Sequence, residues 1–284
     1  MNIMDKIKIT TLLIILISSI QGIYAQSTGG VFPFNTKDKV VIDTVQLMVS
    51  YELVFLPDST KKNVKLTNQL SLALGNSYAK QMNSEYFDIE NLQKKARKGS
   101  EYNLEGRGLA ATIIYKNKKT NQMEVNVKLA DQCSYRYIES IPMQDWKILN
   151  QKKEVLGYSC QAATTTYLGR TYTAWFAPTI PIHEGPWKFS GLPGLILEVA
   201  DNRGHYVFKS IGIRRPKQQE FIEKYKIKFV DINRKKLNSY IKNLHENYAT
   251  VLEAQGYTVA YFTPEGKEID NKKLSYPYNP IELE

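Results

Sequence analysis

The chain has 284 residues, of which 43% are hydrophobic, and a formal net charge of +10. This length suits one domain with an ordinary core, and the hydrophobic content excludes a disordered chain. No internal repeat or low-complexity tract occurs, which argues against solenoids and propellers.

Residues 1–25 are typical of a secretory signal peptide. Lys6 and Lys8 precede a largely apolar stretch from Ile9 to Ile20, and the small residue Ala25 ends the segment. A membrane anchor is the alternative, but a spanning helix needs about 18 apolar residues and this stretch is shorter. No cysteine lies near the cleavage point to carry a lipid. We therefore expect export to the periplasm or cell envelope.

Apolar residues alternate with polar ones through much of residues 26–284, which predicts antiparallel strands joined by short turns. We expect a single domain with an irregular C-terminal tail that begins near Ser275. Strand-like runs occur within 40–56, and the other predicted strands lie at 63–74, 109–115, 123–129, 134–141, 146–149, 155–166, 171–177, 195–200, 205–213 and 221–232.

Two segments have helical periodicity. Asp88–Lys98 predicts a short helix, and Arg234–Gln255 predicts a long one that Asn233 caps and Gly256 ends. Many hairpins and few helices predict an α+β fold, a β-rich antiparallel twisted sheet or half-barrel with one long helix in the C-terminal half.

Gly191-Leu192-Pro193-Gly194 predicts a tight turn that leads directly into a buried strand. Pro193 presets the φ of the first central position, and Gly194 tolerates the positive φ that a type II turn needs next. Leu195, Leu197 and Val199 then share one face of an extended segment.

This turn and strand resemble the motif after which the GLPGLI family is named, an exported family of Bacteroidetes with unknown function. Other parts of the chain resemble the same pattern, with Ala163 departing from it where a lysine is expected nearby. The matching segments are 146–148, 157–162, 169–176, 180–181, 185–189 and 278–283.

The order of motifs from Trp175 to Gly204 also resembles lipoprotein carriers of the LolA type. That resemblance implies a convex sheet wrapped around a helix, with an apolar concavity. It concerns the fold and does not assign a function.

Four residues in or beside turns are candidate ligand-binding residues: Arg170, Trp175, Trp187 and Lys188. An arginine among aromatic rings can hold an anion and stack on a ring. The alternative is structural, because large aromatic side chains are usually buried and Arg170 could form an ion pair within the fold.

Cys133 and Cys160 are the two cysteines, and export permits them to form a disulfide. Such a bridge would contribute roughly 3.5 kcal/mol in the chain-entropy model. Two free thiols are the alternative, and a catalytic Cys160 would need His183 nearby, with Glu184 as a further group.

The segment 205–245 has eleven Lys and Arg residues against three Asp and Glu. Lys224, Lys226 and Lys228 lie close in sequence to Arg234–Lys236. In an exported protein such a segment favours anionic envelope lipid or an acidic envelope protein over nucleic acid, and the alternative is a solvated face. Oligomeric state is left open.

The sequence lacks the common catalytic, dinucleotide-binding and zinc-binding motifs, so we expect no cofactor and no metal. The favoured hypothesis is a non-enzymatic envelope binding or scaffold protein that holds an apolar or amphiphilic ligand or docks an envelope partner. The alternative hypothesis is an envelope hydrolase or metal-dependent enzyme that uses Cys160, His183 and Glu184.

Overall fold

The computed structural model describes residues 38–83, 110–129, 131, 133–254 (without the Leu252 side chain), 275 and 277–284. It also describes the backbone of four short strands, β1 (Leu13–Leu16), β2 (Ala25–Thr28), β17 (Tyr261–Phe262) and β18 (Glu268–Ile269). The predicted helix at Asp88–Lys98 lies outside the described residues.

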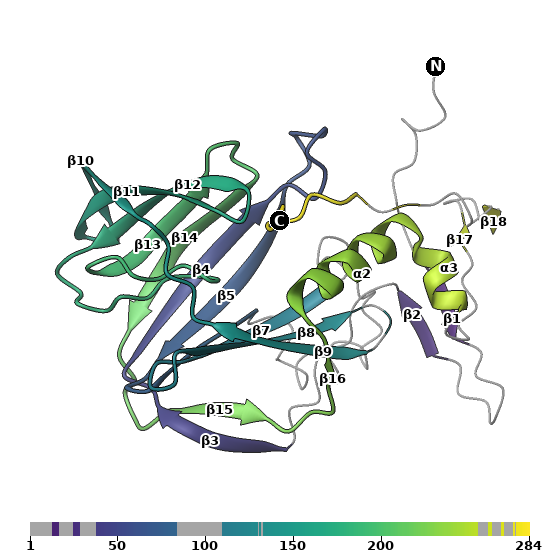
Figure 1. Cartoon of the computed structure of the whole chain (residues 1–284), viewed down its shortest axis with the longest axis horizontal. Coiled ribbons are helices and arrows are strands. Elements are labelled where there is room, and N and C mark those ends of the chain that lie inside the picture. Colours follow the sequence, from purple (N-terminus) through teal and green to yellow (C-terminus); the bar gives the residue numbers. More distant parts are fainter. Residues whose placement is uncertain are drawn as a thin grey trace.

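The main element is an open, twisted sheet of 12 strands in the order β10-β11-β12-β13-β14-β4-β5-β6-β7-β8-β9-β16 (Figure 1). All neighbours pair antiparallel except β16 and β9. These strands are β4 (Leu47–Phe55), β5 (Leu66–Leu74), β6 (Tyr78–Asn83), β7 (Ala110–Asn117), β8 (Gln122–Leu129), β9 (Ser134–Ser140), β10 (Lys147–Val155), β11 (Tyr158–Tyr167), β12 (Arg170–Ala177), β13 (Leu195–Asp201), β14 (Tyr206–Arg214) and β16 (Val230–Asp231). The chain is therefore β-rich, in agreement with the predicted fold class.

A second, two-stranded sheet pairs β3 (Lys39–Thr44) with β15 (Phe221–Tyr225). The predicted strand at 221–232 is thus wrong as a single element, because β15 ends at Tyr225 and β16 joins the main sheet at Val230. The alternation persists between them, since Ile227 and Phe229 pack against the core while Lys226 and Lys228 are exposed.

The helical segment covers one face of the sheet beside β7–β9 (Figure 1). It is divided into α2 (Arg234–Glu246) and α3 (Tyr248–Glu253), so the prediction of one helix to Gln255 is wrong. Asn247 caps α2 in a non-helical conformation, as asparagine often does. The predicted N-cap is confirmed, because the Asn233 side chain accepts a hydrogen bond from the Lys236 N–H at 2.8 Å.

Most predicted hairpins are confirmed because their turns are encoded locally. Leu168 and Gly169 both have positive φ, 47° and 77°, which suits a two-residue hairpin turn between β11 and β12. The strands predicted at 146–149 and 155–166 form the hairpin β10–β11, whose first strand extends to Val155.

The Gly-Leu-Pro-Gly segment does turn into a buried strand, but the type II geometry is wrong. The Gly194 N–H donates to the Leu192 carbonyl at 2.8 Å, which is a three-residue turn around Pro193. Gly194 has a φ of 155°, and a Cβ there would lie 2.3 Å from the Ala177 carbonyl oxygen. The glycine is required because the β12 backbone passes so close.

Candidate ligand-binding site

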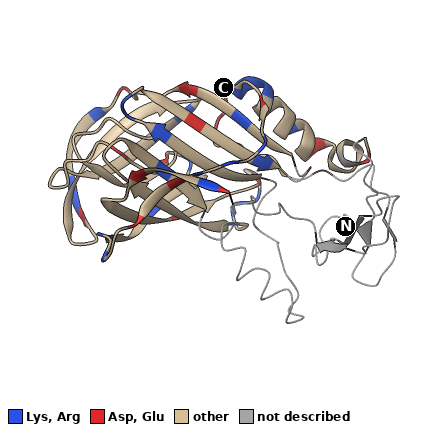
Figure 2. Cartoon of the chain, turned by 90° about the horizontal axis from the view of Figure 1, so that it is seen from below, with Lys and Arg blue, Asp and Glu red and all other residues tan. Residues whose placement is uncertain are grey.

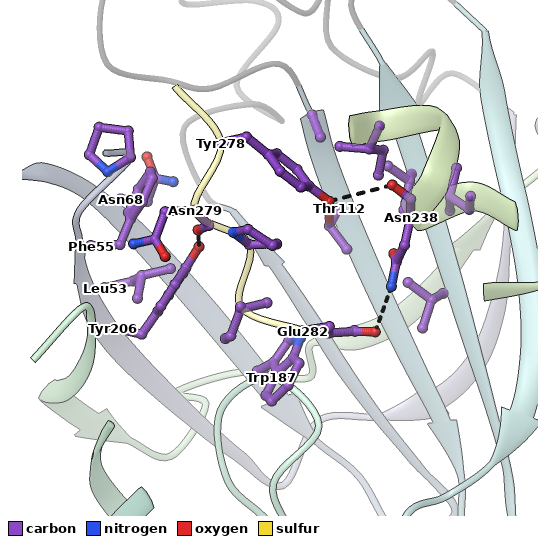
Figure 3. A pocket seen from close by; sticks show the side chains of 18 of the residues that line it. Leu53, Phe55, Asn68, Thr112, Trp187, Tyr206, Asn238, Tyr278, Asn279 and Glu282 are labelled. Atoms are coloured by element: carbon purple, nitrogen blue, oxygen red, sulfur yellow. Dashed lines mark hydrogen bonds between the residues drawn. The ribbon is translucent and has the colours of Figure 1, made fainter. Parts of the chain in front are cut away.

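A cavity of about 320 Å³ lies between one face of the main sheet, α2 and the C-terminal tail, residues 277–284 (Figure 3). Its wall is mainly apolar. The lining residues from the sheet and the preceding loops are Leu53, Phe55, Pro57, Leu66, Asn68, Ala110, Thr112, Ile114, Val125, Val127, Tyr137, Trp187, Lys188 and Tyr206. Those from α2 and the tail are Leu237, Asn238, Ile241, His245, Pro277, Tyr278, Asn279, Pro280, Ile281 and Glu282.

The period-two pattern of the strands builds the sheet side of this wall. Ala110, Thr112 and Ile114 alternate along β7, and Val125 and Val127 do the same along β8. Residues two apart share one face of a strand, so these side chains all point into the cavity. On the opposite side, the helical spacing of Leu237 and Ile241 presents apolar groups from α2.

Arg170 fixes the tail at one end of the site. Its guanidinium donates to the Pro280 carbonyl at 2.6 Å, to the Asn279 side-chain oxygen at 2.9 Å and to the Ile281 carbonyl at 3.1 Å. It also forms a fully buried ion pair with Asp201 at 2.9 Å. Arg170 is therefore a structural residue, as the alternative interpretation from the sequence proposed.

Further contacts hold the same stretch of tail. The Asn279 side chain donates to the Leu56 carbonyl at 2.7 Å, and the Leu283 N–H donates to the Leu168 carbonyl at 3.0 Å. A Cβ at Gly169 would lie 2.7 Å from the Leu283 Cβ, so the turn glycine makes room for the tail. The tail has no regular secondary structure, as predicted, yet it is closely tied to the sheet.

Lys188 fixes the tail at the other end. Its ammonium donates to Glu282 Oε1 at 2.5 Å, and its side chain is 1% exposed. Burial lowers the pKa of Lys188, and the neighbouring Glu282 carboxylate opposes that shift. The rings of Tyr137 and Trp187 lie 5.2 and 5.5 Å from the ammonium and provide favourable cation–π contacts.

Glu282 is also bound from α2. Its Oε2 atom accepts hydrogen bonds from Arg234 Nη1 and from Asn238 Nδ2, both at 3.1 Å (Figure 3 shows the second). Arg234 pairs with a second carboxylate, that of Glu139, at 2.9 Å. The cavity therefore has one charged corner in an otherwise apolar wall.

Two of the four predicted binding residues, Trp187 and Lys188, line the cavity. Arg170 binds the C-terminal tail, which forms part of the cavity wall. Trp187 belongs to an aromatic cluster with Tyr167, at 5.7 Å between ring centroids, and Phe189, at 5.1 Å. It is 9% exposed, so it is largely a core residue that shows one edge to the cavity.

Trp175 lies elsewhere. Tyr172, Ala174 and Phe176 fill the buried face of β12, and the alternation puts Trp175 on the other face. There the Lys153 ammonium lies 4.6 Å from the Trp175 ring and pairs with Glu198. Trp175 therefore packs beneath a surface ion pair and does not line the cavity.

The predicted Cys133–Cys160 disulfide is absent from the structure, in which both thiols are free. Cys133 precedes β9 and Cys160 is in β11, and eight strands separate β11 from β9 in the sheet. Burial raises the pKa of the Cys160 thiol to about 11, which disfavours the thiolate that nucleophilic chemistry needs.

The other groups of the enzyme hypothesis are used differently. The Glu184 carboxylate forms a buried ion pair with Lys116 at 2.9 Å, and the His183 side chain is exposed. Among the described residues no group of three or more His, Cys, Asp and Glu side chains could hold a metal ion. In the same part of the chain, every helix is too short or too polar to cross a membrane.

The basic segment is partly neutralised within the fold. Lys224 pairs with Glu124, Arg234 with two carboxylates, and Lys242 with Glu246. Figure 2 shows Lys and Arg positions interspersed with Asp and Glu along the strands and α2. The pattern fits a solvated face, which was the alternative to a lipid-binding surface.

Sequence reasoning did not identify Arg234, Asn238 or Glu282 as site residues. The tail segment from Tyr278 to Leu283 belonged to the family resemblance, which was the available signal. Glu282 meets Lys188 across 94 residues of sequence, a pairing that local patterns do not reveal.

Comparison with protein families gives one match, to a family described as a protein of unknown function (Porph_ging), over residues 167–198. This segment includes the hairpin turn before β12, the loop with Lys188 and the start of β13. The match supports a relationship to a family of unknown function over a short stretch and does not specify the GLPGLI family.

A search of curated proteins gave no significant match. Two solved structures of PNGF-II, in space groups P21 and C2, are similar to the chain with TM-scores of 0.46 and identities of 15% and 16%. Each match covers 70% of this chain and 33% of the PNGF-II chain, so the chain spans about a third of those proteins.

Proposed function

We propose that this chain is an exported binding protein of the cell envelope, without catalytic activity, whose cavity holds an apolar or amphiphilic ligand. The cavity supports this function because its wall is largely apolar and carries a few polar groups, of which the charged ones gather at one corner. A volume of about 320 Å³ falls within the range of small-molecule sites, which combine apolar walls with a few orienting polar groups.

Dye binding tests this function. The mature chain, starting at Gln26, should bind the apolar fluorophore 1-anilinonaphthalene-8-sulfonate saturably, and dodecanol should displace the dye. Ala110 lies in the sheet wall, so Ala110→Phe should fill the cavity and abolish dye binding. Ala254→Phe places the same ring at an exposed position and serves as the matched control.

Thermal melting checks that both variants are folded, and Ile241→Phe provides a second cavity-filling variant from the α2 side. Absence of saturable dye binding to the mature chain, or binding that both cavity-filling variants leave unchanged, rejects the cavity as a ligand site. N-terminal sequencing of the protein from the envelope fraction tests export, with Gln26 as the expected first residue.

A further inference from the structure

The charged corner of the cavity is built around a carboxylate. Both oxygens of Glu282 are bound: Oε1 by Lys188 at 2.5 Å, and Oε2 by Arg234 and Asn238 at 3.1 Å. The donors come from the loop before β13 and from α2, so they are positioned by two separate elements. Two cations and an amide that surround both oxygens form a specific carboxylate site.

The carboxylate in this site comes from the tail, two positions before Glu284. Arg234 has Glu139 as a second partner, whereas Lys188 forms an ion pair with Glu282 alone among the described residues. Arg234 Nη1 also donates to the Glu284 backbone oxygen at 2.8 Å, so without Glu282 the Arg234 guanidinium would keep acceptors and Lys188 would lose its ion-pair partner. Because burying an uncompensated charge is costly, the corner then favours another anion.

The same corner opens onto apolar wall. Lys188, Asn238 and Glu282 all line the cavity, together with Val127, Leu237 and other apolar side chains. Figure 3 shows Asn238 and Glu282 beside each other at this corner. A molecule with a carboxylate at one end and an alkyl chain behind it matches both parts of this surface. An uncharged apolar molecule would match only the wall.

We propose that the ligand of this cavity is an amphiphile with a carboxylate head group, which binds Lys188, Arg234 and Asn238 by displacing the Glu282 side chain. The tail then acts as an intramolecular competitor that occupies the head-group site in the absence of ligand. This inference rests on the proposed binding function of the cavity and adds the chemical class of its ligand.

The test compares dodecanoate with dodecanol, which share the alkyl chain and differ in the head group. Affinities are measured by dye displacement for the unaltered mature chain, Glu282→Gln and Lys188→Met. The unaltered chain should bind dodecanoate more tightly than dodecanol. Glu282→Gln removes the competing charge and should bind dodecanoate roughly tenfold more tightly, with dodecanol unchanged.

Lys188→Met should remove the preference for dodecanoate and keep dodecanol binding. Glu246→Gln removes a carboxylate from the exposed side of α2 and is the matched control, which should behave like the unaltered chain. If Glu282→Gln does not fold, Glu282→Ala provides a second way to vacate the site. Dodecyl phosphate is tested in parallel, and tighter binding of the phosphate would replace carboxylate with phosphate as the head group and overturn the inference.

The outcomes separate the two proposals. Equal binding of dodecanoate and dodecanol, unchanged in the Glu282 variants, overturns the carboxylate site and leaves the apolar binding function intact. Failure of the mature chain to bind dye, alcohol or acid rejects the binding function itself.

Discussion

Arg170 and Lys188 both hold the C-terminal tail, but their counterions have different origins. Arg170 is neutralised by Asp201, which lies at the end of β13 within the folded sheet. Lys188 is neutralised by Glu282, which belongs to the tail itself. Removal of the tail would therefore leave Arg170 paired and Lys188 unpaired.

The two cations also differ in chemistry. A guanidinium keeps its proton at any ordinary pH, whereas a buried ammonium can release its proton when its counterion is lost. Burial already lowers the pKa of Lys188. The Arg170 end is thus suited to permanent attachment, and the Lys188 end to an interaction that can be exchanged.

The largest expected effect is a difference in the free energy of unfolding when the counterion of Arg170 or that of Lys188 is removed. Asp201→Asn leaves the buried guanidinium of Arg170 without a counterion and should lower the free energy of unfolding by about 3–5 kcal/mol. Glu282→Gln should cost less, about 1–3 kcal/mol, because Lys188 can lose its proton. Urea unfolding followed by circular dichroism measures both.

A double variant, Arg170→Met with Asp201→Asn, is the control for the charge itself. Each single substitution leaves one buried charge without its partner, whereas the double variant removes both charges. The double variant should therefore lose less free energy of unfolding than the sum of the two single losses. Equal losses for Asp201→Asn and Glu282→Gln would contradict the distinction between a permanent and an exchangeable end.

The second prediction concerns the loop that sets the position of Lys188 relative to β12. A Cβ at Gly194 would lie 2.3 Å from the Ala177 carbonyl oxygen, so Gly194→Ala must displace the loop or the strand. We expect a loss of about 2–3 kcal/mol. Gly204→Ala is the matched control, because Gly204 has a φ of 65° but no atom near the added Cβ.

The control should cost only about 1 kcal/mol, which is the usual penalty for a non-glycine residue at positive φ. Melting temperatures of the two variants give the comparison directly. A Gly194→Ala protein as stable as the Gly204→Ala protein would show that the close approach of the backbone is easily relieved.

The parts of this fold that were predictable from sequence are those with local causes. The Leu168-Gly169 and Asp201–Gly204 turns, the alternation of β12 and the Asn233 cap all depend on neighbouring residues. Strand β6 was not predicted because it buries Lys80, Gln81 and Asn83. Buried polar residues interrupt the alternation of apolar and polar residues that normally identifies a strand.

The site was predictable only in part, for a related reason. Arg170, Trp187 and Lys188 were identified from one continuous segment, but the groups that give them a role lie in the tail and in α2. The disulfide was inferred from the expected compartment and the number of cysteines. Neither of these indicates the strand order of the sheet, which places Cys133 far from Cys160. Long-range pairing decides these features.

The smallest expected effect concerns Lys80, a third buried cation, and the pH dependence of the free energy of unfolding. Lys80 is 6% exposed and donates to the Glu223 backbone carbonyl at 2.8 Å, while its ammonium lies 4.1 Å from the Tyr225 ring centre. Burial lowers the pKa of Lys80 from 10.5 to about 8. Among the described residues Lys80 has no hydrogen bond to a carboxylate of the kind that neutralises Arg170 and Lys188, although the Glu223 carboxylate opposes the lowering of its pKa.

Between pH 8 and 10.5 the folded chain binds fewer protons at Lys80 than the unfolded chain, so this group makes the free energy of unfolding rise with pH. We expect Lys80 to contribute a gain of about 1–2 kcal/mol from pH 8 to 9.5, measured by urea unfolding. Cys160 and buried tyrosines such as Tyr225, whose pKa values burial raises to about 11 and about 12, oppose this gain, so the contribution of Lys80 is the difference in slope between the unaltered chain and Lys80→Met. Lys80→Met should lack this contribution, whereas Lys62→Met, at an exposed position, should retain it. Equal slopes in Lys80→Met and the unaltered chain would assign the pH dependence to other groups and would remove Lys80 as the cation of the three without a carboxylate hydrogen bond among the described residues.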